Sequence, residues 1–175
     1  MIRLLAVSAL LLTAAAPGLP YPSYGASALQ RKADLSISAI PIDTPLAKVK
    51  GRLTKVPGSC EADGNCEWRD KAGVRHYFWG DVKPSPLVIK FVHAKDFRGR
   101  PIRALGIGMA RSKPAVIKAV KAFDPRIKLD CDRARVSGNV GPQECSFTTN
   151  PGWIQIGFDR NDQLTMIRFD GYQFT

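Results

Sequence analysis

The chain has few of the side chains that enzymes use for acid–base or nucleophilic chemistry. Its 175 residues include only two histidines, His76 and His93. No serine lies in a nucleophile elbow, and the glycines of residues 105–109 lack the third glycine of a dinucleotide-binding motif. Carboxylate pairs such as Asp159 and Asp162 fall in a predicted turn, which they favour by themselves. We therefore expect no enzymatic activity and no cofactor, and we expect the glycines to shape the backbone before a helix.

Acidic residues are also scarce. Fifteen Asp and Glu stand against 26 Lys and Arg, which gives a formal net charge of +11 at pH 7. The basic residues are spread along the chain, with denser stretches at residues 48–52 and 95–103. Such a charge favours an acidic partner: an acidic protein surface, an anionic lipid or a cell-wall polymer. The alternative is that these residues only solvate the surface. Nucleic acid is the least favoured partner, because no nucleic-acid-binding motif is recognisable.

Beyond residue 16 the sequence contains no apolar run long enough to cross a membrane. The run of residues 4–16, which follows Arg3, has the length and the flanks of a secretory signal. Small residues at 26–28 offer a cleavage site, and residues 14–16 offer another. We therefore predict a signal peptide over residues 1–28, a mature chain without a transmembrane segment, and a periplasmic or secreted location.

The four cysteines of an exported chain predict two disulfides. A metal site is the less favoured alternative, because metal-binding cysteines are usually separated by about two to four residues. Here five residues separate Cys60 from Cys66, and thirteen separate Cys131 from Cys145. Three pairings are possible by counting. The internal repeat favours Cys60 with Cys66 and Cys131 with Cys145, so that each half holds one local bridge and no metal.

The internal repeat is an order of predicted elements that occurs in residues 40–92 and again in residues 105–169. Each stretch predicts an amphipathic helix, then a cysteine pair, a turn and alternating aromatic strands. We interpret this order as a tandem duplication; a chance match of short amphipathic segments is the alternative. The predicted fold class is α+β, with two tandem helix-on-antiparallel-sheet repeats, residues 29–98 and 99–175, each with a local disulfide.

The helices of the repeat are predicted from their caps and their apolar spacing. In the later copy Ser112 is the N-cap and Asp124 ends the helix; in the earlier copy Thr44 is the cap and Pro45 the first helical residue. Apolar residues at spacings of three and four share one side of a helix. These residues are Val116, Ile117, Val120 and Phe123 in the later copy, and Leu46, Val49 and Leu53 in the earlier one.

The predicted strands, residues 74–79, 87–92, 154–158 and 164–169, concentrate the aromatic residues. Alternation along a strand places neighbouring side chains on opposite faces, so one set packs under the helix and the other faces outward. Outward rings with cations between them would form a binding face, although most of the rings could instead fill two thin cores. The candidate partner-binding residues are Trp68, Arg75, Tyr77, Trp79, Lys90, Trp153 and Arg168.

A capped helix, a disulfide, an aromatic hairpin and a last strand, given twice in an exported chain, resemble the β-lactamase-inhibitory-protein fold. More distantly, the pattern is similar to small lipoproteins of outer-membrane assembly. The resemblance rests on residues 107–116 and 145–169 in the later copy, and on residues 44–49 and 66–79 in the earlier one. It implies that each copy packs a helical segment on a four-stranded antiparallel sheet. It also implies a concave sheet face that grips a partner protein.

Two departures limit what the resemblance implies. In that family an aspartate of the first hairpin plugs the partner enzyme, but Val74 stands at this position here. The nearest acid, Asp70, is a further candidate for partner binding. The lipoproteins require an acylated cysteine, which the export signal lacks, so β-lactamase inhibition and lipid anchoring are not expected.

The sequence therefore predicts a non-catalytic exported protein that binds, or inhibits, an acidic protein partner through a concave aromatic and basic sheet face. The alternative is a soluble envelope factor that binds an anionic lipid or a cell-wall polymer mainly by charge.

Overall fold

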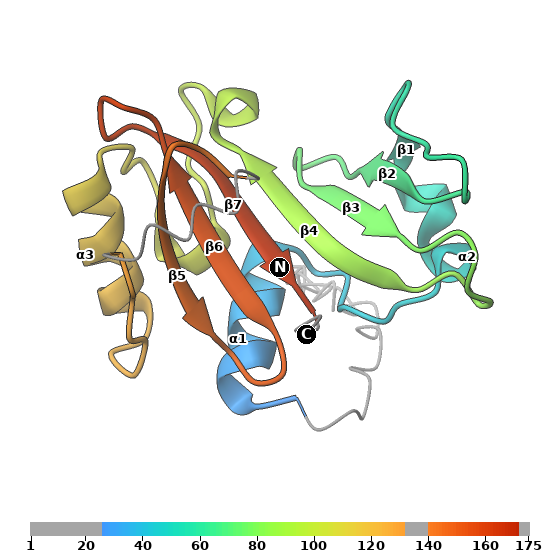
Figure 1. Ribbon diagram of the computed structural model, residues 1–175, viewed down its shortest axis with the longest axis horizontal. Helices are drawn as coiled ribbons and strands as arrows, with labels where there is room; N and C mark the ends of the chain where they lie inside the picture. Colours follow the sequence, from blue (N-terminus) through green and yellow to red (C-terminus); the bar gives the residue numbers. More distant parts are fainter. Residues whose placement is uncertain (1–25, 132–139, 172–175) are drawn as a thin grey trace, which may run out of the picture.

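The computed structural model describes residues 26–131 and 140–171, in which seven strands form one antiparallel sheet (Figure 1). The order across the sheet is β1-β2-β3-β4-β7-β6-β5, so the second half of the chain continues the sheet of the first half. The strands are β1 (Thr54–Lys55), β2 (Cys66–Arg69), β3 (Arg75–Phe78), β4 (Leu87–His93), β5 (Gln143–Thr148), β6 (Trp153–Phe158) and β7 (Leu164–Asp170).

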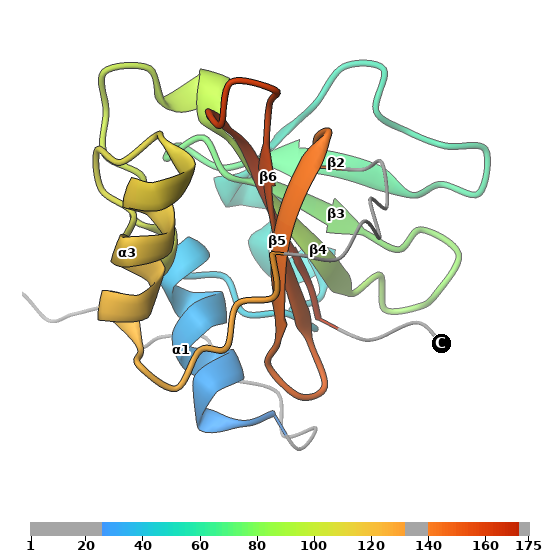
Figure 2. The same cartoon turned by 60° about the vertical axis from the view of Figure 1, so that its left-hand side comes forward.

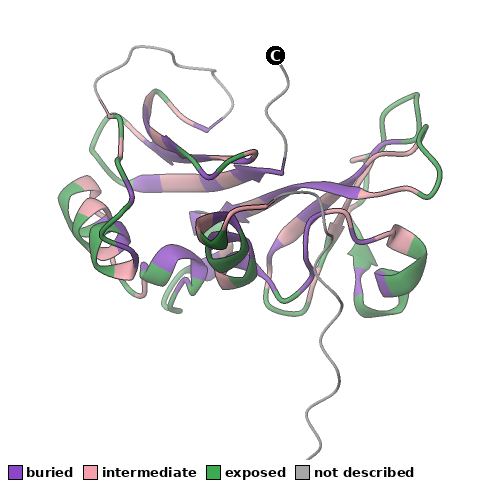
Figure 3. Cartoon of the chain, turned by 90° about the horizontal axis from the view of Figure 1, so that it is seen from below, coloured by how far each residue is buried: buried purple, intermediate pink, exposed green. Residues whose placement is uncertain are grey.

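The α-helices of the described residues lie on one side of this sheet, as Figure 3 shows from below. Figure 2 shows α1 and α3 on the same side of β5 and β6, with β2 and β3 running at a steep angle to these two strands. The opposite face of the sheet carries no described helix. The helices are α1 (Ala28–Ile37), α2 (Leu46–Val49) and α3 (Lys113–Phe123), and the 3₁₀ segments are η1 (Lys50–Arg52), η2 (Ala94–Phe97) and η3 (Ala104–Gly106).

The helix α1 begins at a serine cap that also ties it to the second half of the chain. Ser27 Oγ accepts a hydrogen bond from Gln30 N at 3.0 Å, and Ser27 N donates to Asn150 O at 3.2 Å. The cap satisfies one of the N–H groups that the first turn leaves free. Cleavage after Ala28 would remove this cap, whereas cleavage near residue 16 would leave it in place.

The helix α3 confirms the prediction for the later copy. It follows Ser112 at the N-cap position and ends with Asp124 at the C-cap position. Val116 and Val120 are fully buried against the sheet, as their spacing predicts. The Asp124 carboxylate binds Arg126 and also accepts a hydrogen bond from Lys32 Nζ of α1 at 3.2 Å, which links the two helices.

The chain enters α3 through a bend for which the glycines are needed. Gly106 and Gly108 have φ values of 67° and 59°, a region that only glycine adopts without strain. The predicted role of these glycines in shaping the backbone before the helix is confirmed.

The earlier predicted helix is much shorter than expected. The structure contains only one turn, Leu46–Val49, with Pro45 rather than Thr44 at the N-cap position. The backbone oxygen of Thr44 accepts a hydrogen bond from Leu87 N at 3.0 Å, which holds the chain extended at this point. Gly51 follows soon after, and glycine disfavours helix by about 1 kcal/mol relative to alanine. The long helix of the first half is instead α1, which the sequence did not predict.

The two halves meet where β4 pairs with β7. The register runs from Ile89 opposite Asp170 to His93 opposite Met166. The expected α+β class, with helices on an antiparallel sheet, is therefore confirmed. The resemblance implied four strands in each copy, whereas the described residues place β1–β4 on one side of this pairing and β5–β7 on the other. The tandem duplication itself stays a prediction.

The core lies between the helices and the sheet. Residues directly opposite one another in antiparallel strands share a face, and two rows of paired residues face the helices. The inner positions of α1 and α3 pack on these rows. From β4 outwards the first row is Lys90, Phe169, Ile154 and Phe147, and the second is Val92, Ile167, Ile156 and Cys145.

Both predicted disulfides are present. Cys60 bonds to Cys66 and Cys131 bonds to Cys145, and no described cysteine is free. In the chain-entropy account, loops as short as these contribute roughly 2 to 3 kcal/mol each. The second bridge stabilises the core directly, because Cys145 is fully buried beside β6.

Among the described residues no helix is both long and apolar enough to cross a bilayer. The predicted signal peptide lies outside the described residues except for residues 26–28, of which Ala28 is the first residue of α1.

Candidate functional site

The face of the sheet opposite the helices is called the open face here. The strand register assigns its side chains, because they alternate with those that face the helices. Three rows of paired residues cross it. The first contains Glu67, Tyr77, Ile89, Asp170, Trp153 and Thr148; the second Arg69, Arg75, Phe91, Arg168, Gln155 and Ser146; the third His93, Met166, Gly157 and Glu144.

Part of the open face is covered by the chain itself. Val140 crosses β6, and its carbonyl oxygen accepts a hydrogen bond from Thr165 Oγ1 at 2.6 Å. A Cβ atom on Gly157 would lie 1.9 Å from this oxygen, so only glycine allows the crossing. Gln155 is fully buried in the same region. The accessible part of the open face therefore lies over β2, β3, β4 and β7.

A pocket of about 390 Å³ lies in this accessible part and is walled by aromatic rings. Tyr77 Oη donates a hydrogen bond to Glu61 Oε2 at 2.9 Å. Burial, together with the neighbouring Glu61 carboxylate, raises the pKa of Tyr77 to about 12, so the phenol stays protonated and neutral at physiological pH. The residues that line the pocket are Glu61, Glu67, Tyr77, Trp79, Val88, Ile89, Phe91 and Arg168.

Two of the three arginines of the open face, Arg75 and Arg168, are already paired with carboxylates. Arg168 binds both oxygens of Asp170, with Nε to Oδ2 at 2.9 Å and Nη2 to Oδ1 at 2.8 Å. Its guanidinium lies 5.7 Å from the Phe91 ring centroid. Arg75 lies between Glu67, at 3.2 Å, and Asp96, at 3.5 Å. These contacts fix both guanidinium groups and cancel most of their charge on this face.

Lys90 is not on the open face, which corrects the expectation from the sequence. Both its side chain and that of Asp34 in α1 are 0% exposed, and the two form an ion pair. Lys90 Nζ also donates to Asp34 O at 3.2 Å and to Ser38 O at 3.3 Å. Burial lowers the pKa of Lys90, and the Asp34 carboxylate opposes this effect. Lys90 therefore holds α1 on the sheet and is not accessible to a partner.

Trp68 and Asp70 are also absent from the open face. Trp68 pairs with His76 in the helix-facing row, and the ammonium of Lys50 lies 5.8 Å from the Trp68 ring centroid. Asp70 Oδ2 lies 3.1 Å from His76 Nε2, and Asp70 Oδ1 accepts from Val74 N at 2.9 Å. The Asp70 side chain is thus occupied in holding the β2–β3 turn and does not project outward.

The His76 ring is fully buried beside Lys90. Burial lowers the pKa of His76, although its hydrogen bond to Asp70 acts in the opposite sense. A neutral ring that donates from Nε2 leaves Nδ1 as an acceptor, and Nδ1 is buried without a partner. Burial alone would raise the pKa of Asp70, but hydrogen bonds from His76 and the turn backbone outweigh it and lower that pKa.

The structure therefore gathers five of the eight predicted residues on or beside the open face: Arg75, Tyr77, Trp79, Trp153 and Arg168. Sequence reasoning missed Ile89 and Phe91, which line the same pocket. Both alternate with Lys90 along β4, so treating Lys90 as a buried residue would have placed them outward. Lysine is rarely buried, and the sequence carried no signal that pointed to its partner Asp34.

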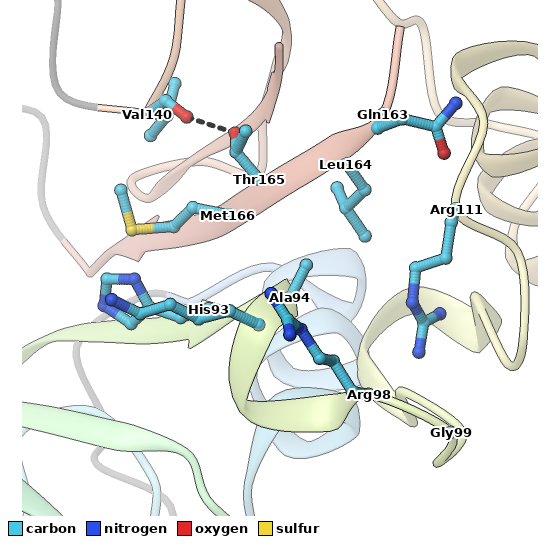
Figure 4. Close-up of a pocket in the computed structure, with 11 residues that line it drawn as sticks. His93, Ala94, Arg98, Gly99, Arg111, Val140, Gln163, Leu164, Thr165 and Met166 are labelled. Atoms are coloured by element: carbon cyan, nitrogen blue, oxygen red, sulfur yellow. Dashed lines mark hydrogen bonds between the residues drawn. The ribbon is translucent and has the colours of Figure 1, made fainter. Parts of the chain in front are cut away.

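A second pocket, of about 660 Å³, lies where β4 leaves the sheet at η2 and β7 begins (Figure 4). His93 and Met166 lie on one side of it, and Leu164 lies between β7 and η2. Burial and the nearby Arg75 lower the pKa of His93, so its ring is neutral at pH 7. The pocket is lined by apolar side chains with the cations Lys95, Arg98 and Arg111 among them.

Arg111 in this pocket has a structural role. Its guanidinium donates to four backbone oxygens, those of Gly108, Ala110, Phe97 and Arg100, at 2.7–3.2 Å. These bonds join the segment before α3 to the segment after η2. The second pocket therefore has a rigid side at Arg111, and its floor consists of the start of β7.

Comparison with protein-family models, with curated proteins and with solved structures finds no match. The protein is therefore classified here by its architecture alone. It is an α+β chain with helices on one face of an antiparallel sheet, an open face opposite, and two local disulfides. The resemblance to the β-lactamase-inhibitory-protein fold stays a prediction.

Proposed function

We propose that this chain is a non-catalytic binding protein that docks a partner protein on the accessible part of its open face. The observation that carries the proposal is a sheet face without a described helix on which the half-buried rings of Tyr77 and Phe91 are displayed over β3 and β4. Aromatic rings on a rigid support supply most of the binding energy in many protein interfaces. Packing of the other face against the helices holds these rings in place.

The partner is proposed to insert an apolar side chain into the 390 Å³ pocket. The ion pairs of Arg75 and Arg168 form a fixed polar rim beside it. Because these charges are already paired, the rim adds hydrogen bonds and orientation more than long-range attraction. The binding should therefore survive moderate salt, which differs from the charge-driven binding expected from the composition.

Export from the cytoplasm is part of the proposal. The two disulfides support it, because such bonds persist in oxidising compartments. A periplasmic chain and a secreted chain would both meet this condition. The proposed partner is accordingly a protein of the envelope or of the medium, and binding inhibits it only if the partner presents its active site to the pocket.

The test is capture of the partner by the immobilised oxidised chain from envelope and medium fractions, at low and at moderate salt. The variant Tyr77→Ala/Trp79→Ala removes two rings from the pocket. The control variant Leu35→Ala/Met109→Ala removes two exposed apolar side chains, which are 49% and 60% accessible, away from the open face. Equal thermal unfolding temperatures would establish that both variants are folded.

We expect one protein to be retained in stoichiometric amount by the wild type and by the control. Its affinity for the Tyr77→Ala/Trp79→Ala variant should be lower by a factor of roughly 30 or more, because aromatic anchors contribute about 2 kcal/mol or more. If the pocket variant retained the same protein with unchanged affinity, the open face would not be the docking surface.

A second function, the binding of an anionic lipid or cell-wall polymer, is supported by a different observation. The unpaired cations of the described residues lie mainly outside the open face, and several gather at the turn end of the β2–β3 hairpin. Binding that is lost steeply as salt rises, and that does not respond to the Tyr77→Ala/Trp79→Ala change, would favour this function.

A further inference from the structure

The two basic stretches of the sequence, residues 48–52 and 95–103, come together in the structure. Arg52, from η1, and Arg100, which follows η2, line the same pocket of about 460 Å³. Arg69 and Lys71, from the turn end of the β2–β3 hairpin, complete it. We call these four cations and the space between them the basic pocket. All four side chains belong to residues that are exposed.

Two carboxylates also line the basic pocket, but both have partners outside the set of four cations. Asp70 accepts from His76 Nε2 and from Val74 N. Asp96 Oδ2 lies 3.5 Å from the guanidinium of Arg75. Among the described residues no carboxylate forms an ion pair with Arg52, Arg69, Lys71 or Arg100. Four cations therefore face one space with their charges uncancelled by direct pairing.

One of the four cations is held in position by the protein. Arg100 Nη2 donates to Asp96 O at 2.6 Å, and its guanidinium lies 5.2 Å from the Phe97 ring centroid. This hydrogen bond and this ring contact place the Arg100 guanidinium, which fixes one wall of the basic pocket.

We propose that the basic pocket binds a phosphate group of an anionic ligand. Cations held close together repel one another, and a concave site concentrates their field on an anion that enters it. A phosphate dianion matches this excess of charge, and guanidinium groups bind its oxygens in pairs. The group can come from the headgroup of an anionic lipid or from a free phosphorylated compound. This site is separate from the aromatic pocket and does not rest on the partner protein proposed above.

The test compares two variants that each remove two positive charges. Arg52→Gln/Lys71→Gln changes the basic pocket, and Lys118→Gln/Lys121→Gln changes exposed positions on the outer side of α3. Inorganic phosphate is titrated into the oxidised chain at constant ionic strength, with acetate as the comparison anion. Backbone amide NMR shifts report both the affinity and the place of binding. Co-sedimentation with phosphatidylcholine vesicles, with and without phosphatidylglycerol, tests the lipid source.

We expect phosphate to shift the amides of residues 51–54 and 69–73 saturably, with an affinity at least tenfold lower in the pocket variant and unchanged in the control. If the pocket variant also loses binding to phosphatidylglycerol vesicles while the control keeps it, the source is a lipid headgroup. Saturable phosphate binding without vesicle binding assigns a free phosphorylated compound. Shifts that do not saturate, or equal losses of phosphate affinity in both variants, would overturn the proposal. General surface charge would then be enough to explain the binding.

Discussion

Replacing Lys90 with methionine would leave the Asp34 carboxylate in the core without its cation. Both side chains are 0% exposed. The Lys90 ammonium has three N–H donors, and it has three acceptors: the Asp34 carboxylate, Asp34 O at 3.2 Å and Ser38 O at 3.3 Å. The other carboxylate oxygen, Asp34 Oδ2, accepts from Ile42 N at 3.0 Å. The ion pair thus joins α1 to the centre of the sheet.

Breaking a buried ion pair by removing one partner costs about 3–5 kcal/mol. Domains have a total stability of about 5–15 kcal/mol, so Lys90→Met should remove a large share of the free energy of unfolding. For a chain of this length the unfolding temperature should fall by roughly 6 to 20 °C. A comparable loss is expected for Asp34→Ala, because the Lys90 ammonium would then be buried without a counter-charge.

The assay is urea unfolding of the oxidised chain at pH 7, followed by circular dichroism. The double variant Lys90→Met/Asp34→Asn removes both charges and keeps an oxygen for Ile42 N, so it should be more stable than Lys90→Met alone. Lys118→Met, at an exposed position of α3, is the control and should change stability by less than about 0.5 kcal/mol. The reasoning would be refuted by a Lys90→Met variant as stable as the wild type, or by a double variant no better than the single one.

Two further predictions concern pH and close packing. Burial holds the pKa of His76 below its ordinary value of 6.5. Just below pH 6.5 the His76 ring is therefore protonated in the unfolded chain but stays neutral in the folded chain. Stability should be complete above pH 6.5 and decline as the pH falls below it; an NMR titration in which the His76 ring titrates at 6.5 or higher would contradict this. Gly157→Ala should cost about 1–3 kcal/mol in urea unfolding, because its Cβ would overlap Val140 O, whereas Gly51→Ala, which meets nothing within 4 Å, should not.

The elements that sequence patterns predicted well are those whose local signals agree with their surroundings. Strands β4, β6 and β7 alternate or are strongly apolar, and α3 has both a serine at its N-cap position and an apolar stripe. The helix α1 was missed because Asp34 stands at a core position of its inner side. The apolar stripe is therefore interrupted, and only the tertiary contact with Lys90 makes this position favourable.

The candidate site was predicted in part for a related reason. Tyr77 and Trp68 are both hairpin aromatics, but they occupy opposite faces, because Trp68 pairs with His76 whereas Tyr77 pairs with Glu67. Which face is outward depends on where the helices lie, and a shift of one residue in register would exchange the two faces. The sequence shows that side chains alternate between the two faces, but it does not show which face is covered by the helices. The covering of β6 by Val140 is likewise a contact between residues that are distant in sequence, so no local pattern predicts it.

The pairing of β4 with β7 also determines when the sheet can form completely during synthesis of the chain. Strand β4 must wait for a partner that lies about 80 residues further along the chain. Contacts so distant in sequence slow folding, and an unpaired central edge invites association with other chains. A chain interrupted before β7 would therefore expose that edge permanently. Synthesis of the chain through β7 is therefore a condition for the first half of the sheet to have all its strands paired.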